Sequence, residues 1–248
     1  MRIECALESY CSMFGVSEPS AKQAYAEALN HYRGKREAQW IVRMRDKWYS
    51  SMELEDADLS LYSHPLYFCD LLACFKIYSS EYIKKVKGLD LHASTCLDLG
   101  CGLGLTTRAL VEAGITGAVG TNIRGTPQYE FCESHVNVVS DHRQVGGVDL
   151  VFASEYFEHI YNASDHLFEV IEFNKPKVIV MANAFNAKSF GHYNHFYNGK
   201  WASKSVPCDS YVPCHRMGRL FSQILKSEGY RKMKTGFWND RPNVWTRE

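Results

Sequence analysis

The sequence predicts an α/β protein: a doubly wound, seven-stranded, mostly parallel sheet preceded by a helical extension. Two observations lead to this prediction. From Thr95 onward, short apolar runs alternate with helical patterns, as in a parallel sheet covered by helices. Before residue 90, aromatic and aliphatic residues recur at helical spacing without strand alternation. We therefore expect a helical extension or lid over residues 1–90 and an α/β domain over residues 91–248.

The extension contains three helical patterns. The pattern over residues 18–49 breaks near Gly34. The stretch HPLYFCDLLACFKIY is apolar nearly all round, which indicates a buried helix starting at Pro65. A shorter helix, SSEYIKKVKG, is expected to stop at Gly88.

The α/β domain shows five strand patterns, followed by a helix and a final hairpin. The strands are TCLDLG, GAVGTNI, VNVVS, VDLVFAS and PKVIVMANAF, and helices follow the first (TTRALVEAG) and the second (entered at Thr126-Pro127). Residues 186–215 are interpreted as irregular. The stretch RMGRLFSQILKSEG predicts an amphipathic helix, and YRKMKTGF with NVWTR predicts the hairpin. The apolar face of that helix comprises Met217, Leu220, Phe221, Ile224 and Leu225.

Composition limits the possible partners and compartments. The chain has 28 basic and 28 acidic residues, so no global field would hold a polyanion or an anionic membrane. Nine scattered cysteines and a start without a signal-peptide pattern favour a reducing cytoplasm. No apolar run approaches the roughly 18 residues of a membrane span. Basic residues interleaved with Trp40 and Trp48 are interpreted as a solvated helix face in preference to a phosphate-binding patch.

A glycine-rich turn joins the first strand to its helix. In LDLGCGLG, Asp98 is followed by Gly100, Gly102 and Gly104. Glycines at such a turn let the backbone approach a ligand and leave helix N-terminal amides pointing at it. By itself this turn does not separate a methyl-donor cofactor from a dinucleotide, although the chain lacks the G-x-G-x-x-G spacing that dinucleotide sites favour.

This segment and the order of elements after it resemble the class I S-adenosylmethionine-dependent methyltransferases, which have a Rossmann-like fold. The resemblance implies that the glycine loop lies along the cofactor and that the end of the second strand holds the ribose, where Asn122 stands in place of the usual acidic residue. It also implies that Asp141 and His142 lie near the adenine. With Ser154 at the end of the fourth strand, these residues make up the expected cofactor site.

A second cluster of polar residues follows the fourth strand, in SEYFEHI. If a helical turn follows Ser154, then Glu155, Glu158 and His159 lie at i, i+3 and i+4 on one face. Two carboxylates and an imidazole suit a divalent ion such as Mg²⁺ or Mn²⁺. His192 and His195, beyond the fifth strand, face the same crevice in a doubly wound sheet and are candidates for a further ligand or a base.

The E-x-x-E-H constellation is similar to that of the HEN-type small-RNA 3′-terminal 2′-O-methyltransferases. That resemblance implies a metal held by Glu155, Glu158, His159 and His195, and a substrate hydroxyl on an RNA-end ribose or a related nucleotide or sugar. Asn194 stands where that family usually has an aspartate, and Tyr197-Asn198 replace a Glu-Trp pair. His159 and His192 are the candidate catalytic bases.

Other interpretations stay open from the residues alone. Glu158-His159 can be an ordinary helix start in a metal-free methyltransferase of a small metabolite. The chain can also be a cofactor-binding partner subunit without catalysis. Cys208, Cys214 and His215 could form a zinc site, although the usual C-x-x-C spacing is absent.

Overall fold

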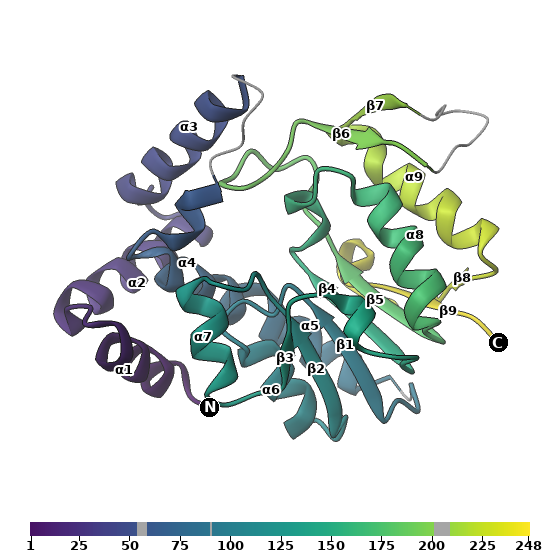
Figure 1. The fold of residues 1–248 in the computed structure, drawn as a ribbon, viewed down its shortest axis with the longest axis horizontal. Helices are drawn as coiled ribbons and strands as arrows, with labels where there is room; N and C mark the ends of the chain where they lie inside the picture. The colour runs from purple at the N-terminus through teal and green to yellow at the C-terminus, as the bar shows by residue number, and fades with distance from the viewer. Residues whose placement is uncertain (54–58, 90, 201–208) are drawn as a thin grey trace.

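The computed structural model describes residues 1–53, 59–89, 91–200 and 209–248. The main sheet has seven strands in the order β3-β2-β1-β4-β5-β9-β8. Strands β1 to β5 are parallel, whereas β9 runs antiparallel to both β5 and β8. The predicted doubly wound sheet with a helical N-terminal part is confirmed (Figure 1).

The strands match the predicted segments. Their bounds are β1 Thr95–Leu99, β2 Gly117–Thr121, β3 Val138–Val139, β4 Leu150–Ser154, β5 Val178–Ala182, β8 Arg231–Lys232 and β9 Asn243–Thr246. The chain order reverses at β1, which has β2 on one side and β4 on the other. The carboxyl ends of these strands therefore flank a crevice at a topological switch point.

Alternate residues of the strands face two hydrophobic cores. One face packs against α5 (Ser80–Lys87) and α6 (Leu105–Glu112), the other against α8 (Ala163–Asn174) and α9 (Cys214–Ser227). The five apolar residues predicted for one face of α9 are all buried there. Each buried apolar side chain of that size contributes about 1.5–3 kcal/mol, so this face attaches α9 firmly to the sheet.

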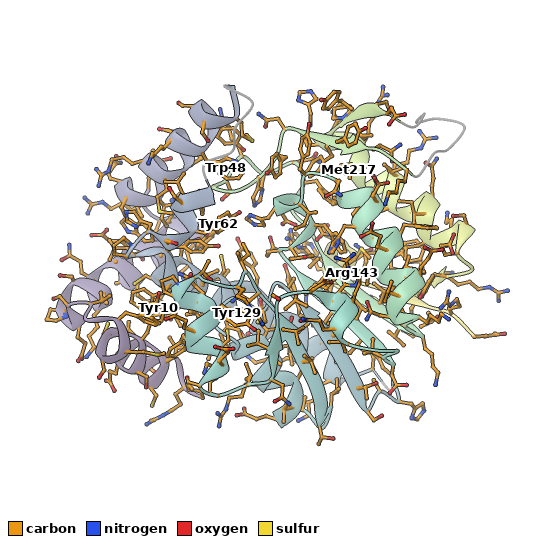
Figure 2. All side chains as sticks on the ribbon, viewed as in Figure 1. Tyr10, Trp48, Tyr62, Tyr129, Arg143 and Met217 are labelled. Atoms are coloured by element: carbon orange, nitrogen blue, oxygen red, sulfur yellow. The ribbon has the colours of Figure 1, made fainter. Side chains whose placement is uncertain are left out.

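The N-terminal helices are α1 Ile3–Phe14, α2 Glu18–Tyr32, α3 Gln39–Glu53 and α4 Tyr67–Cys74, with a 3-10 turn η1 at Leu59–Ser63. They lie together on one side of the sheet in Figure 1 and share a core with Leu103, with Phe131 of α7 (Pro127–Glu133) and with Phe190. Trp40 and Trp48 belong to this core, so neither could stack on a nucleic acid from the surface. Figure 2 shows Trp48 and Tyr62 on this side of the molecule and Met217 on the other.

Two sequence predictions about local structure were wrong. The two separate helices expected over residues 65–88 form one continuous helical segment, because a π-helical turn, η2 Phe75–Ser79, joins α4 to α5 with helical backbone angles at both junctions. The irregular stretch 186–215 contains an antiparallel pair, β6 His195–Asn198 and β7 Ser210–Pro213. Phe196 and Val212 of this pair are buried, and their packing favours the strands.

No helix within the described ranges is long and apolar enough to cross a membrane.

Candidate functional site

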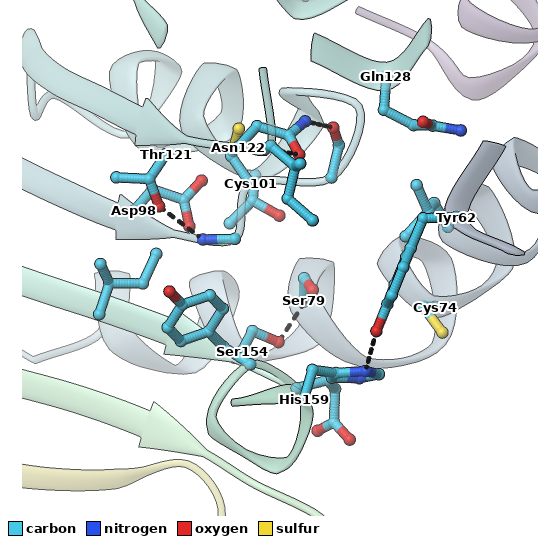
Figure 3. Close-up of a pocket in the computed structure, with 18 of the residues that line it drawn as sticks. Tyr62, Cys74, Ser79, Asp98, Cys101, Thr121, Asn122, Gln128, Ser154 and His159 are labelled. Carbon is cyan, nitrogen blue, oxygen red and sulfur yellow. Dashed lines mark hydrogen bonds between the residues drawn. The ribbon is translucent and has the colours of Figure 1, made fainter. Parts of the chain in front are cut away.

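A cavity of about 640 Å³ opens at the carboxyl ends of β1, β2 and β4. It joins the glycine loop to the segment after β4 and to the N-terminal helices (Figure 3). The predicted site residues that line it are Asp98, Gly100, Gly102, Asn122, Asp141, His142, Ser154, Glu155, His159 and His192. Gly104, Glu158 and His195 are not in the lining.

The glycine loop adopts left-handed backbone angles that favour glycine. Gly100, Gly102 and Gly104 have φ values of 67°, 59° and 75°. A Cβ at Gly100 would overlap the ring of Tyr156. At Gly104 a Cβ would lie 2.7 Å from Val136 Cγ2, so this glycine serves helix packing behind the loop, whereas the other two line the cavity.

Asp98 anchors the loop from the end of β1. Its side chain is buried, and Thr107 Oγ1 donates a hydrogen bond of 2.7 Å to Asp98 Oδ2. Burial raises the pKa of Asp98 to about 7, while the Thr107 hydrogen bond opposes the shift. Beside it, Gly100 N donates to Thr121 Oγ1 at 3.0 Å, which ties the loop to β2.

The structure gives a local reason for asparagine at position 122. Asn122 Nδ2 donates to Gly102 O at 2.7 Å, and Asn122 Oδ1 accepts from Ile123 N at 2.8 Å (Figure 3). An aspartate at this position could not donate to Gly102 O, and its carboxylate oxygen would face that carbonyl oxygen, so that two hydrogen-bond acceptors would repel each other. The asparagine thus closes the glycine loop, and its Oδ1 keeps one lone pair for a ligand hydroxyl.

Asp141 and His142 are held by the residues around them. Asp141 Oδ2 accepts from Arg143 Nη2 at 2.7 Å, and this pairing lowers the pKa of Asp141. His142 Nδ1 lies 2.9 Å from Asn174 Oδ1, so Nδ1 is the donor and Nε2 carries the lone pair. Both residues line the cavity, and their place beside an adenine stays a prediction.

The segment after β4 is not the helical turn that the sequence predicted. Glu155 adopts a left-handed conformation with φ of 52°, and a 3-10 turn, η4, follows at Phe157–His159. Phe157 N donates to Asn183 Oδ1 at 3.3 Å, which fixes the turn against the end of β5. Glu155, Glu158 and His159 therefore do not share one helical face.

Glu158 turns into the protein. It is 0% exposed, and its Oε1 accepts from Ala184 N at 2.7 Å, while its Oε2 is buried without a hydrogen-bond partner. Burial, and then the nearby charge of Glu155, raise the pKa of Glu158. The glutamate pair thus favours a state in which Glu158 carries a proton at neutral pH.

Arg241 is the main partner of Glu155, and nothing in the sequence pointed to it. Its Nη2 forms an ion pair with Glu155 Oε1, and its guanidinium lies over the Tyr82 ring, 5.8 Å from the centroid. Burial raises the pKa of Glu155, and the charge of Arg241 opposes that shift. The cation beside Glu155 is therefore an arginine 86 positions further along the chain, where the sequence had predicted a metal ion.

The two downstream histidines lie in different places. His192 packs edge-on against His159, with ring centroids 4.8 Å apart, and His192 Nδ1 lies 2.8 Å from Ala187 O. His195 begins β6, opposite Pro213, and is exposed. Of the pair, His192 is therefore the one in the cavity wall.

The predicted metal set does not meet around a common point in this structure. Glu155, Glu158, His159 and His195 are all described, and no three of them have ligand atoms that lie within 4.8 Å of one another. Cys208, one member of the zinc alternative, lies outside the described residues.

His159 and His192 both have lowered pKa values, which keep their rings neutral. Burial lowers the pKa of His159 well below its usual value, and the charge of His192 acts in the same direction. Burial also lowers the pKa of His192 to about 4. Because Ala187 O can only accept, His192 Nδ1 donates to it, and Nε2 carries the lone pair of the neutral ring.

The N-terminal helices contribute residues that the sequence analysis missed. Tyr32, Tyr62, Tyr67, Asp70 and Tyr78 line the cavity. Tyr62 Oη lies 3.2 Å from His159 Nδ1, and Tyr32 Oη donates to Asp70 Oδ1 at 2.8 Å. Burial raises the pKa of Asp70 to about 6. For Tyr67, Asp70 and Tyr78 the only sequence signal was an apolar helix that contained a single aspartate, and Tyr32 and Tyr62 had none.

The fold and the cavity define a Rossmann-like α/β protein with a cavity at the switch point of its sheet. No protein-family model matches the chain, and no curated protein matches it. Among solved structures it is similar to the methyltransferase domain of bacterial CtHen1-C, with 15% identity over 68% of this chain and 96% of that one (TM-score 0.44).

Two further solved structures resemble it. One is magnesium protoporphyrin IX methyltransferase from Synechocystis PCC 6803 with bound S-adenosylmethionine, at 12% identity over 78% of this chain and 86% of that one (TM-score 0.46). The other is a putative S-adenosylmethionine-dependent methyltransferase from Listeria monocytogenes, at 17% identity over 68% and 99% (TM-score 0.43).

Proposed function

We propose that this chain is an S-adenosylmethionine-dependent methyltransferase that acts on a hydroxyl group. One observation carries the proposal: a single cavity connects the glycine loop after β1 with Glu155, His159 and His192. The glycine loop and a neutral imidazole thus share one cavity, as the transfer of a group to a hydroxyl requires.

The residues present fit the cofactor. A volume of about 640 Å³ lies within the roughly 300–1,000 Å³ of small-molecule sites. Gly100 and Gly102 bring the backbone to the cavity wall. Asn122 Oδ1 can still accept a hydrogen bond from a ligand, and Asp141 and His142 line another part of the cavity. When bound, S-adenosylmethionine supplies a methyl group activated by its sulfonium.

His192 is the proposed base and His159 its neighbour. His192 is neutral at neutral pH, with Nε2 as the lone-pair nitrogen, so it can accept the proton of the acceptor hydroxyl. The hydrogen bond between Tyr62 and His159 holds the adjoining ring in place. The N-terminal helices, proposed as a lid over residues 1–90, supply the aromatic wall on the acceptor side.

A metal-assisted version is the second candidate, with Mg²⁺ or Mn²⁺ at Glu155, Glu158 and His159 and an RNA-end ribose or a related nucleotide or sugar as acceptor. The buried Oε2 of Glu158, which has no hydrogen-bond partner, favours this version, because burial of an unpaired carboxylate oxygen is costly unless a cation or a proton binds it. Arg241 stands against it, since Glu155 would have to leave the ion pair to become a ligand. His195 would also have to move from β6.

The first experiment measures S-adenosylhomocysteine binding by calorimetry, with Gly100→Ala as the variant and Gly146→Ala as the matched control. Gly100 lines the cavity, whereas a Cβ at Gly146 meets nothing within 4 Å. We expect binding to wild type and to Gly146→Ala and at least tenfold weaker binding to Gly100→Ala. Absence of binding to the wild-type protein would refute the proposal.

The second experiment measures methyl transfer to RNA ends, nucleotides and hydroxylated metabolites, with and without a chelator. Activity that survives the chelator and is lost in His192→Asn supports the base mechanism. Activity that the chelator abolishes and Mn²⁺ restores supports the metal-assisted version. Cofactor binding without transfer to any acceptor in the panel would favour the non-catalytic partner subunit.

A further inference from the structure

A cluster of potential metal ligands lies away from the E-x-x-E-H segment. His142, His166 and Glu169 each offer one ligand atom, and the three atoms all lie within 4.8 Å of one another. Among residues 1–53, 59–89, 91–200 and 209–248 this is the only such group of three or more histidines, cysteines or acidic residues. It was not predicted, because His142 comes from the loop after β3 and the other two from α8.

The α8 helix and the 3-10 turn η3 (His142–Gln144) bring these side chains together. His166 and Glu169 are spaced i, i+3, so they lie on the same face of α8. Buried Asn174 attaches η3 to the end of that helix: its Nδ2 donates to His142 O at 3.0 Å and to Val145 O at 2.7 Å. The backbone that carries His142 is therefore fixed relative to α8.

Both imidazoles are oriented by hydrogen bonds. His142, 5% exposed, donates from Nδ1 to Asn174 Oδ1, which leaves Nε2 with the lone pair that a metal requires. His166 Nε2 lies 3.0 Å from the hydroxyl of Tyr156, and the two histidine rings meet edge to face with centroids 5.2 Å apart. The Asn174 bond fixes the tautomer of His142, as a partner behind a metal-binding nitrogen does in metal sites, and the Tyr156 bond fixes the ring orientation of His166.

The surrounding charges allow a cation. Glu169 has Lys200 Nζ at 3.5 Å, and that lysine side chain is 82% exposed, so its displacement costs little. Arg143, labelled near α8 in Figure 2, is the other cation nearby, and two of its nitrogens donate to the carboxylate of Asp141. Asp141 thus offsets the charge of Arg143 beside the cluster.

We propose that His142, His166 and Glu169 form a zinc site in the wall of the cavity. Two imidazole nitrogens and one carboxylate are a donor set that zinc uses in sites with three protein ligands and an open fourth position. Mg²⁺ prefers oxygen ligands and is a poorer fit. All three residues line the cavity, so the open position can take water or a ligand atom there. The site shares His142 with the proposed cofactor pocket, but zinc binding is measured without reference to methyl transfer.

The test uses the full chain stripped of metal, titrated with zinc against a chromophoric chelator. His166→Asn and Glu169→Gln are the variants, and Glu172→Gln, an exposed glutamate of the same helix, is the matched control. We expect one zinc per chain, at least tenfold weaker binding in both variants, and unchanged binding in the control. Equal affinity in wild type and both variants would overturn the proposal.

Cobalt(II) absorption provides a second readout, because the described part of the chain contains eight free cysteines that could also bind zinc. A site of nitrogen and oxygen ligands gives visible cobalt bands without the intense near-ultraviolet band of thiolate ligation. That thiolate band would overturn the assignment. Thermal unfolding without zinc shows whether His166→Asn still folds. If that variant does not fold, Glu169→Gln, at a partly exposed position, provides the comparison of zinc affinity with wild type.

Discussion

Removal of Arg241 is the most direct test of the electrostatics at the site. Arg241 forms the ion pair with Glu155, and their side chains are 35% and 16% exposed. Loss of one partner from a buried pair costs about 3–5 kcal/mol, whereas an exposed pair contributes about 0–1 kcal/mol. Because Arg241 is about one-third exposed, we expect Arg241→Gln to lower the free energy of unfolding by about 2 kcal/mol at pH 8.

The pH dependence of this loss follows from the pKa of Glu155. Burial raises that pKa, and Arg241 holds it down. In Arg241→Gln the pKa rises further, so the folded state binds a proton that the unfolded state has released, and stability falls as pH rises above about 4.5. We therefore expect the difference between wild type and variant to be largest near pH 8 and to shrink towards pH 4.

The assay is urea denaturation of wild type, Arg241→Gln, Glu155→Gln and the double variant, with the exposed Arg231→Gln as the matched control. A double-mutant cycle should give a coupling of about 1–2 kcal/mol at pH 8 and less at pH 4. Additive effects at pH 8, or a loss that does not change with pH, would refute the reasoning. The same variant tests the metal-assisted version, which predicts tighter Mn²⁺ binding once Arg241 is removed.

Three further predictions concern Gly100, Asp98 and Asn174. Gly100→Ala should lower the free energy of unfolding by about 1–3 kcal/mol in urea denaturation, since its Cβ would overlap Tyr156; an unchanged denaturation midpoint would contradict the packing. Burial raises the pKa of Asp98 to about 7, so the free energy of unfolding of wild type should fall by up to about 1.4 kcal/mol per pH unit as the pH rises from about 4 to about 7. Asp98→Asn should remove that slope, and equal pH profiles of the two proteins would argue against a buried, protonated Asp98. Asn174→Ala should cost about 2–4 kcal/mol, because it leaves the carbonyls of His142 and its neighbours without their donor; thermal unfolding measures this, and a change below 0.5 kcal/mol would be inconsistent with it.

The α/β architecture was predictable because it depends on local patterns. Each of the five parallel strands is a short apolar run, and the helix of Met217 to Leu225 is amphipathic over its whole length. Burial of these runs is the main source of stability, so the pattern alone leads to the sheet and its covering helices. The π-helical turn at Phe75–Ser79 escaped prediction, since apolar periodicity does not distinguish it from a break between two helices.

The position of the glycine loop in the cavity wall was also predictable. Glycines directly after a buried strand have few uses other than a tight turn with close backbone approach, and Gly100 and Gly102 do line the cavity. The sequence could not explain Asn122, whose reason is a hydrogen bond to Gly102 O, a residue 20 positions earlier in the chain.

The sequence by itself therefore determined the main elements, their order and the edge of the sheet at which the cavity lies. Only the tertiary structure decided which charges meet there. Arg241 reaches Glu155 because β9 lies beside β5, and His142 reaches His166 because Asn174 attaches the β3–β4 loop to α8. The physical reason is that hydrophobic periodicity is a local property, whereas ion pairs and ligand clusters form between distant segments whose contact depends on the completed packing.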